Sequence, residues 1–247
     1  MSSLTNLFIA YGNFLFRYRN YFFPLVLVII VISTQPGTAA PEFLSTLSGV
    51  FVILFGQAIR AAVIGLDYIK RGGINKKVAA EHLVTTGIFA HCRNPLYVGN
   101  LLILCGLLIL YDNLWAGLAG ALFFYLSYCA IIMAEEAFLA AKFGDEYQDY
   151  CSRVPRWLFH LTGLYSTLAG NRFNWRRVIS KDYTTMTTWM ISLVLLLAVK
   201  ESQLHTNWPV WLIVMVAAIT VIVILALLYC IKRLKKSGYL TAPEDSC

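Results

Sequence analysis

The sequence predicts an all-α, polytopic transmembrane bundle of about six spans. Three observations support this fold class. Hydrophobic residues make up 59% of the chain and charged residues only 13%, against about 25% charged in soluble domains. Apolar runs too long for a soluble core recur along most of the chain. Basic residues gather in every second connecting segment, which is the pattern of a membrane protein whose polar segments share one side.

The predicted spans are six apolar runs: residues 21–34, 42–66, 96–111, 114–134, 184–199 and 208–231. A helix needs about 20 residues to cross a bilayer, so the first, third and fifth runs need flanking aromatic residues to complete the crossing. Asp112 and Asn113 separate the third and fourth runs and predict a tight helical hairpin. Residues 4–16 have helical spacing, which suits either an interfacial helix or an extension of the first span.

The basic residues predict the orientation. With six spans, Lys200 is the single base in the connections on one side, and the other connections and both termini hold nearly all the rest. The positive-inside rule then gives cytoplasmic N- and C-termini and places the polar segments at the cytoplasmic face. The net charge of +7 is explained by contact with lipid headgroups, so no nucleic-acid binding is expected.

We divide the chain into four parts: spans one and two (1–66), a central unit (67–157), a cytoplasmic linker (158–183), and the last two spans with a basic tail (184–247). The long inner segments 67–95 and 135–183 are where chemistry is expected, because polar residues that meet a membrane bundle are costly to retain without a role. Neither Cys nor His has metal-ligand spacing, so no metal site is predicted.

The segment 82–99 contains a helix start with anion-binding potential. Gly87 permits a turn, Pro95 suits the first turn of span three, and Asn94 is placed to cap that helix. Free N–H groups at the helix start attract an anion, and Arg93 adds a positive charge beside them. The alternative is an ordinary capped helix with a positive-inside arginine.

Charged residues in or near the membrane form the next group of candidates. Glu135 and Glu136 end span four and, if the helix continues, point about 100° apart, so that at most one faces a given cleft. Arg60 lies inside span two and needs a partner, for which Glu135 or Asp67 are candidates; snorkelling to the inner surface is the alternative.

The segment 143–157 predicts an amphipathic helix on the inner surface that ends at Pro155. Tyr147 and Tyr150 are one turn apart and share its apolar face. A surface helix without chemistry is the alternative.

In this order and spacing, Arg60, Leu-Val-Thr-x-Gly-x-Phe, Arg-Asn-Pro-x-Tyr-x-Gly and a Glu-Glu helix leading to Val-Pro-Arg resemble the isoprenylcysteine carboxyl methyltransferase and phospholipid methyltransferase superfamily, from about Arg60 to Trp157. The resemblance implies a membrane-embedded methyltransferase that uses S-adenosylmethionine at the cytoplasmic face. Its acceptor would be a membrane lipid or a lipidated substrate. The oligomeric state would be a monomer or a homodimer.

The resemblance also implies roles for particular residues. The cofactor contacts carried over by position are His82, Leu83, Val84, Phe89, Asn94, Pro95, Tyr97 and Glu135. The catalytic candidates are Glu135, Glu136, Tyr97 and Arg93, and the substrate-contacting candidates are Arg60, Tyr147 and Tyr150. A carboxylate or thiolate acceptor needs no base, whereas an amine acceptor needs one, for which Glu136, Tyr97 or His91 are candidates.

Two positions depart from the family pattern. Asn94 replaces the usual histidine before proline, and Ile131 replaces an arginine that prenylcysteine enzymes have one turn before the acidic pair. The second change weakens the prenylcysteine interpretation in particular. An NADPH-dependent sterol or steroid-type reductase and a non-catalytic membrane scaffold are the alternatives.

Overall fold

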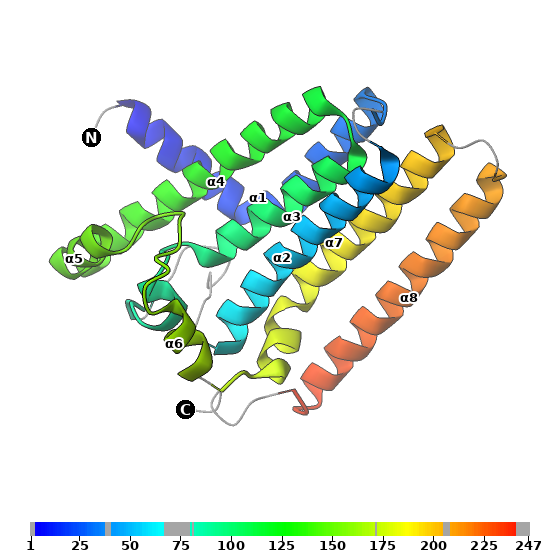
Figure 1. Cartoon of the computed structure of the whole chain (residues 1–247). Coiled ribbons are helices and arrows are strands. Elements are labelled where there is room, and N and C mark those ends of the chain that lie inside the picture. Colours follow the sequence, from blue (N-terminus) through cyan, green and yellow to red (C-terminus); the bar gives the residue numbers. More distant parts are fainter. Residues whose placement is uncertain are drawn as a thin grey trace.

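The computed structural model describes residues 3–37, 41–66, 80, 82–170, 172–204 and 208–240. Within these ranges every regular element is helical, which confirms the all-α prediction (Figure 1). The elements are α1 (Ser3–Ser33), α2 (Glu42–Leu66), the short 3-10 helix η2 (Gly87–Ala90), α3 (Pro95–Tyr111), α4 (Leu114–Phe143), α5 (Asp145–Arg153), α6 (Leu164–Gly170), α7 (Trp175–Leu204) and α8 (Val210–Lys236).

Five of these helices, α1, α2, α4, α7 and α8, are long and apolar enough to cross a membrane. The sixth, α3, has 17 residues, which is at the short end of the range for a span. The chain is therefore an integral membrane protein. Several helices are longer than the predicted spans. Helix α1 begins at Ser3, so residues 4–16 extend the first span. Helix α4 continues past Glu136 to Phe143, and α7 begins at Trp175.

Pro24 lies inside α1 and has no N–H to bond to the carbonyl of residue 20. A proline within a helix bends it, and α1 changes direction along its length (Figure 1). Its second half packs along α4, where Phe23 meets the rings of Phe124 and Tyr128.

Glycines join α2 to α3. Gly49 and Gly56 on α2, and Gly99 and Gly106 on α3, each lie about two helical turns apart and so line one face. A Cβ at Gly56 would stand 2.6 Å from the carbonyl oxygen of Gly99, and one at Gly49 would stand 2.7 Å from that of Gly106. The two backbones are therefore in direct contact, which is how small residues pack helices in membranes.

The connection from α3 to α4 is the predicted tight hairpin. Asp112 adopts a left-handed conformation with φ of 60°, and the Asn113 side chain caps α4 by accepting a hydrogen bond from the N–H of Ala116 at 2.9 Å. Only two residues separate the helices, so α3 and α4 run antiparallel.

The remaining spans are attached at one side. α7 packs on α2 and α3, and α8 packs on α7 (Figure 1). Ile224 is the one buried residue of α8, so most of this helix presents apolar side chains outward, as suits contact with lipid.

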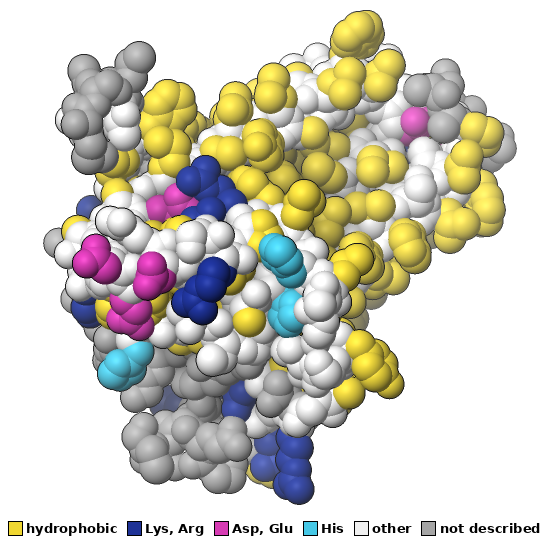
Figure 2. All heavy atoms as spheres, turned by 60° about the vertical axis from the view of Figure 1, so that its left-hand side comes forward, with side chains coloured by type: hydrophobic (Ala, Val, Ile, Leu, Met, Phe, Trp, Pro, Cys, Tyr) yellow, Lys and Arg dark blue, Asp and Glu magenta, His cyan; other side chains and the backbone are white. Residues whose placement is uncertain are grey.

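Charged side chains are concentrated at one end of the molecule. On the face that Figure 2 shows, most Lys, Arg, Asp, Glu and His side chains gather toward one end, and apolar side chains are concentrated toward the other. The charged end contains the segment before α3 together with α5 and the chain that follows α5, which are the predicted inner segments. The structure therefore brings the candidate functional residues to the charged end of the bundle.

Candidate functional site

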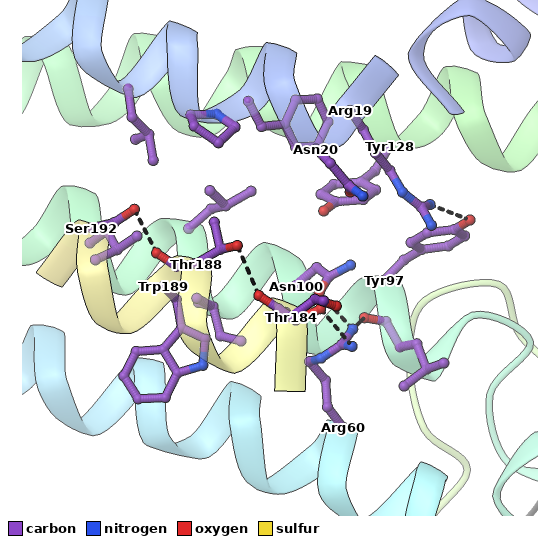
Figure 3. Close-up of a pocket in the computed structure, with 18 of the residues that line it drawn as sticks. Arg19, Asn20, Arg60, Tyr97, Asn100, Tyr128, Thr184, Thr188, Trp189 and Ser192 are labelled. Atoms are coloured by element: carbon purple, nitrogen blue, oxygen red, sulfur yellow. Dashed lines mark hydrogen bonds between the residues drawn. The ribbon is translucent and has the colours of Figure 1, made fainter. Parts of the chain in front are cut away.

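A cavity of about 590 Å³ lies between α1 and α7, with α3 and the inner end of α2 forming its other walls (Figure 3). Its lining changes character along the bundle. Arg19, Asn20, Arg60 and Asn100 lie at the inner end, and apolar side chains line the outer part, among them Phe23, Pro24, Leu27, Ile103, Leu104 and Leu107. The cavity is therefore amphipathic.

Tyr97 connects this cavity to Glu135. Tyr97 is 1% exposed and packs against the ring of Tyr128. Its hydroxyl donates to Glu135 Oε1 at 2.7 Å and accepts a hydrogen bond from Arg19 Nη1 at 3.0 Å. Tyr97 and Glu135, two of the predicted catalytic residues, thus meet at the inner end of the cavity, and Arg19 of α1 bonds to the first of them.

Glu136 faces a different set of partners, as expected for neighbours on a continuous helix. Its Oε1 accepts hydrogen bonds from Arg93 Nη1 and from Arg156 Nε, each at 3.1 Å. Arg93 Nη1 also lies 2.8 Å from the sulfur of Cys151. Burial lowers the pKa of Arg93, but Glu136 and its other neighbours raise it, and the net shift is upward. Arg93 was predicted to offer its charge to an anion at the helix start; this charge is instead matched by Glu136.

The start of α3 differs from the prediction in one detail. Pro95 occupies the first turn, as predicted, but the Asn94 side chain makes no capping bond. Its Nδ2 donates to the carbonyl of Arg156 at 3.2 Å instead. The backbone N–H of Arg93 likewise donates to the carbonyl of Pro155 at 2.9 Å, so the chain before α3 is tied to the chain after α5. Tertiary contact has replaced local capping here.

His91 belongs to the same junction. Its Nδ1 lies 2.8 Å from the carbonyl of His160, and its Nε2 lies 3.0 Å from Thr167 Oγ1. Both ring nitrogens therefore have protein partners, and His91 is not in the lining of the cavity. Neighbouring Cys92 is also enclosed, and burial raises the pKa of its thiol to about 11.

Tyr147 and Tyr150 share a buried face of α5, as predicted, but they pack inward with Val154 and Leu83. The Tyr150 hydroxyl donates to the carbonyl of Phe89 at 2.8 Å. Burial raises the pKa of both phenols, and neither residue lines the cavity. They hold the predicted cofactor segment in place rather than facing the cavity that Arg60 lines.

The other residues of that segment are divided between two clusters. Leu83 packs on the α5 tyrosines, whereas Val84 and Phe89 pack with Ile88 and Leu96. His82 is exposed. The structure therefore gathers most of the predicted cofactor residues at one junction but separates them from the cavity, with Tyr97 as the link.

The partner of Arg60 is Asp182, on α7. This corrects the sequence-based candidates: Glu135 bonds to Tyr97, and Asp67 lies outside the described residues. Arg60 and Asp182 form a buried ion pair, with Nε of Arg60 also 3.3 Å from Asp182 Oδ2. Gln57 Nε2 donates to the same Oδ2 at 2.8 Å, and Trp189 donates to Gln57.

Sequence reasoning missed Arg19, Asp182 and Asn100. Arg19 was one of the basic residues used only to predict the orientation in the membrane, and Asp182 was assigned to the linker although α7 contains it. The requirement that an intramembrane arginine has an acidic partner was a usable signal. It did not identify Asp182, which lies far from Arg60 in sequence. Among the described residues, no group of three or more His, Cys, Asp or Glu side chains is arranged to hold a metal.

Comparison with known proteins identifies the segment that contains this geometry. Residues 44–146, which include Tyr97, Glu135 and Glu136, match the family described as phospholipid methyltransferase. This match supports the resemblance of the segment to the isoprenylcysteine carboxyl methyltransferase and phospholipid methyltransferase superfamily.

Two curated relatives show how far the similarity reaches. Protein-S-isoprenylcysteine O-methyltransferase of Mus musculus is 31% identical over 122 residues, or 47% of this chain and 42% of that protein. Cobalt-zinc-cadmium resistance protein CzcN of Cupriavidus metallidurans is 44% identical over 73 residues, or 30% of this chain and 33% of that protein.

A third relative, nickel-cobalt-cadmium resistance protein NccN of Alcaligenes xylosoxydans xylosoxydans, is 28% identical over 134 residues, or 52% of this chain and 59% of that protein. The similarity therefore spans less than two thirds of each of these relatives. No solved structure matches the chain. Arg19 and Asp182 lie outside the segment matched by the family.

Proposed function

We propose that this protein is an S-adenosylmethionine-dependent methyltransferase of the membrane that acts on a lipophilic acceptor, such as an isoprenylcysteine carboxylate-like group or a phospholipid amine. The observation that carries the proposal is the Tyr97–Glu135 contact at the inner end of an amphipathic cavity, within the superfamily segment. We expect the active site at the cytoplasmic face with both termini on that side, because the basic residues lie there.

The residues present fit the cofactor. S-adenosylmethionine has a sulfonium, an ammonium and a carboxylate, and when bound it supplies an activated methyl group. Glu135 offers its carboxylate to these cations. Among the described residues its hydrogen bond is the one that Oε1 accepts from Tyr97, which leaves Oε2 for the cofactor. Glu136 is held by two arginines and is the weaker candidate. At the start of α3, Pro95 has no N–H and the N–H groups of Tyr97 and Val98 donate to Asn94 O, so this end offers the cofactor carboxylate its helix dipole rather than a set of free donors.

Positioning explains most of the catalysis that we expect from these residues. Methyl transfer is an in-line displacement, so the acceptor atom has to approach the methyl group from the side opposite the sulfur. Tyr97 fixes one oxygen of Glu135, and Arg19 fixes the Tyr97 hydroxyl, so the three side chains form a rigid edge beside the cavity. An acceptor that enters the cavity from lipid would be aligned against that edge.

The acceptor determines whether a base is needed. A carboxylate or thiolate acceptor attacks without losing a proton, whereas an ammonium group has to be deprotonated first. Of the candidate bases, His91 and Glu136 are held in other contacts, as described above. Of these candidates Tyr97 remains, and its hydroxyl can pass a proton from an amine to Glu135, to which it donates.

Methyl labelling tests this proposal. Membranes that contain the protein are incubated with methyl-labelled S-adenosylmethionine, and phospholipids, base-labile protein esters and volatile products are collected separately. We expect label in one of these fractions and a loss of about 10- to 100-fold in Glu135→Gln and Tyr97→Phe, because misplaced reacting groups lower the rate by this order. Glu146→Gln, which changes an exposed acid on α5, is the matched control.

Two results would contradict the proposal. Equal binding of S-adenosylhomocysteine by the wild type and both site variants would show that Glu135 and Tyr97 do not form the cofactor site. Thermal stabilisation of the purified protein by NADPH but not by S-adenosylhomocysteine would favour a membrane reductase instead.

A further inference from the structure

The cavity between α1 and α7 is graded from polar to apolar. Its inner end contains Arg19 and Asn20 of α1, and its outer part is lined by apolar side chains of α1 and α3. Figure 3 shows Thr184, Thr188 and Ser192 along α7, facing α1 across the cavity. The Thr188 and Ser192 hydroxyls donate to carbonyls of their own helix at 2.8 and 3.0 Å, so these donors are already satisfied. A molecule with a polar head and an apolar tail matches this lining.

The two guanidinium groups at the inner end differ in how their donors are used. Arginine has five N–H donors. Those of Arg60 are directed at protein acceptors: Asp182, Leu96 O, Asn100 Oδ1 and Thr185 Oγ1. Asp182 also balances its charge. Arg60 therefore has neither a spare donor nor an unmatched charge for a ligand.

Arg19 has both. Among the described residues it makes one hydrogen bond, to the Tyr97 hydroxyl, and no ion pair. Its guanidinium lies over the rings of Phe16 and Tyr97, at 4.9 and 5.6 Å from their centroids, which fixes its plane beside the cavity. The Tyr97 hydroxyl lies between Arg19 and Glu135, whose charge acts on Arg19 without a direct ion pair. A cation within a membrane helix normally has an anionic partner, because its burial is costly.

From these contacts we infer that Arg19 binds the anionic head group, a carboxylate or a phosphate, of the lipophilic acceptor. Its planar fork suits either oxyanion, and Asn20 beside it adds an amide donor (Figure 3). The inference rests on the proposed function, since it names the class of acceptor. It makes α1, which lies outside the superfamily segment, the helix that selects the head group. The Tyr97 bond then holds that head group next to Glu135.

Binding of matched brominated probes tests this role in the purified full chain. Dibromostearate has a carboxylate head, and dibromostearyl alcohol has the same tail with a neutral head. Bromine quenches tryptophan fluorescence at short range, and Trp189 lines the cavity. The part of the quenching that Trp189→Phe removes therefore reports on the cavity.

We expect the wild type to bind the carboxylate probe at least about tenfold more tightly than the alcohol, because a partly buried ion pair contributes on this order. Arg19→Gln should remove most of this preference. Arg19→Lys should keep part of it, since lysine retains the charge but not the planar fork. The control Arg17→Gln, an exposed residue of the same helix, should keep it fully.

Three results would overturn the inference. Equal affinity of the wild type for the two probes does so without any variant, even if Arg19→Gln fails to fold. Survival of the preference in folded Arg19→Gln also does so. The third result is loss of the carboxylate preference in Lys181→Gln while Arg19→Gln keeps it. This would assign the head group to Lys181, a second cation in the lining.

S-adenosylhomocysteine binding, measured on the same samples, separates this inference from the proposed function. Arg19→Gln loses its bond to Tyr97 and should therefore weaken this binding, but much less than Glu135→Gln does. If Arg19→Gln abolishes it while the probe preference remains, Arg19 holds the cofactor carboxylate and the inference is wrong. If the wild type binds no S-adenosylhomocysteine but shows an Arg19-dependent preference, the proposed function fails and the head-group site stands.

Discussion

Helix α2 contacts α3 and α7 in two different ways. Toward α3 it presents glycines, so the two backbones touch. Toward α7 it presents Arg60 and Gln57 at the inner end, and Ser45 and Thr46 at the outer end. The first contact depends mainly on shape, with hydrogen bonds from Arg60 to Leu96 O and Asn100 Oδ1 at its inner end, whereas the second depends on hydrogen bonds and charge.

The difference also shows which contact of α2 borders the cavity. Lipid tails are as apolar as leucine, so helices in a membrane associate through close packing or polar contacts rather than through hydrophobic burial. Backbone contact between α2 and α3 leaves no space for a ligand. Of the side chains that meet between α2 and α7, Arg60 and Trp189 also line the cavity, so the polar contact borders it.

The largest effect should come from breaking the charge pair on the polar side. Asp182→Asn leaves the Arg60 guanidinium buried without a counter-ion, which typically costs about 3–5 kcal/mol. We expect this loss in the free energy of unfolding, measured by titration with SDS. The double variant Arg60→Met with Asp182→Leu should recover most of it, because a buried pair can be replaced by apolar residues of similar volume at little cost. A double variant as unstable as Asp182→Asn would show that the pair has another structural role.

A smaller effect should come from separating the glycine-packed helices. In Gly56→Ala the new Cβ would lie 2.6 Å from the carbonyl oxygen of Gly99, so α2 and α3 have to move apart. Overpacking of this kind costs about 1–3 kcal/mol. Gly117→Ala on α4 is the control, since nothing lies within 4 Å of its added Cβ. The melting temperatures of both purified variants provide the test. Equal melting temperatures would refute the backbone contact between α2 and α3.

The smallest effect should come from Lys200, at the outer end of α7. Lys200 is 1% exposed and donates to Ser45 Oγ at 2.9 Å, to Thr46 Oγ1 at 3.3 Å and to Leu110 O at 3.1 Å. Lys200→Met loses these bonds but also removes the cost of burying an ammonium group, so we expect a net loss of about 1 kcal/mol. Lys236→Met, at the exposed end of α8, should change the melting temperature little. A loss as large as that of Asp182→Asn would mean that the two ends of α7 are held equally strongly.

The sequence alone predicted the elements that depend on local pattern. Long apolar runs gave the spans, the Asp112–Asn113 pair gave the hairpin, and Tyr147 and Tyr150 share a helix face as their spacing requires. Motif spacing also identified the superfamily segment. These properties follow from hydrophobicity, turn chemistry and helical period, all of which are read over a few neighbouring residues.

Tertiary structure decided which polar groups meet. Both Glu135 and Asp182 were available in sequence to neutralise Arg60, and only the docking of α7 on α2 selected Asp182. The bundle likewise brought Arg19 to Tyr97 and turned Asn94 away from its helix toward Arg156. Pairing between distant polar groups depends on how helices dock and in which register. No local pattern in the sequence encodes this, because many arrangements of the same apolar helices satisfy the same hydrophobic pattern.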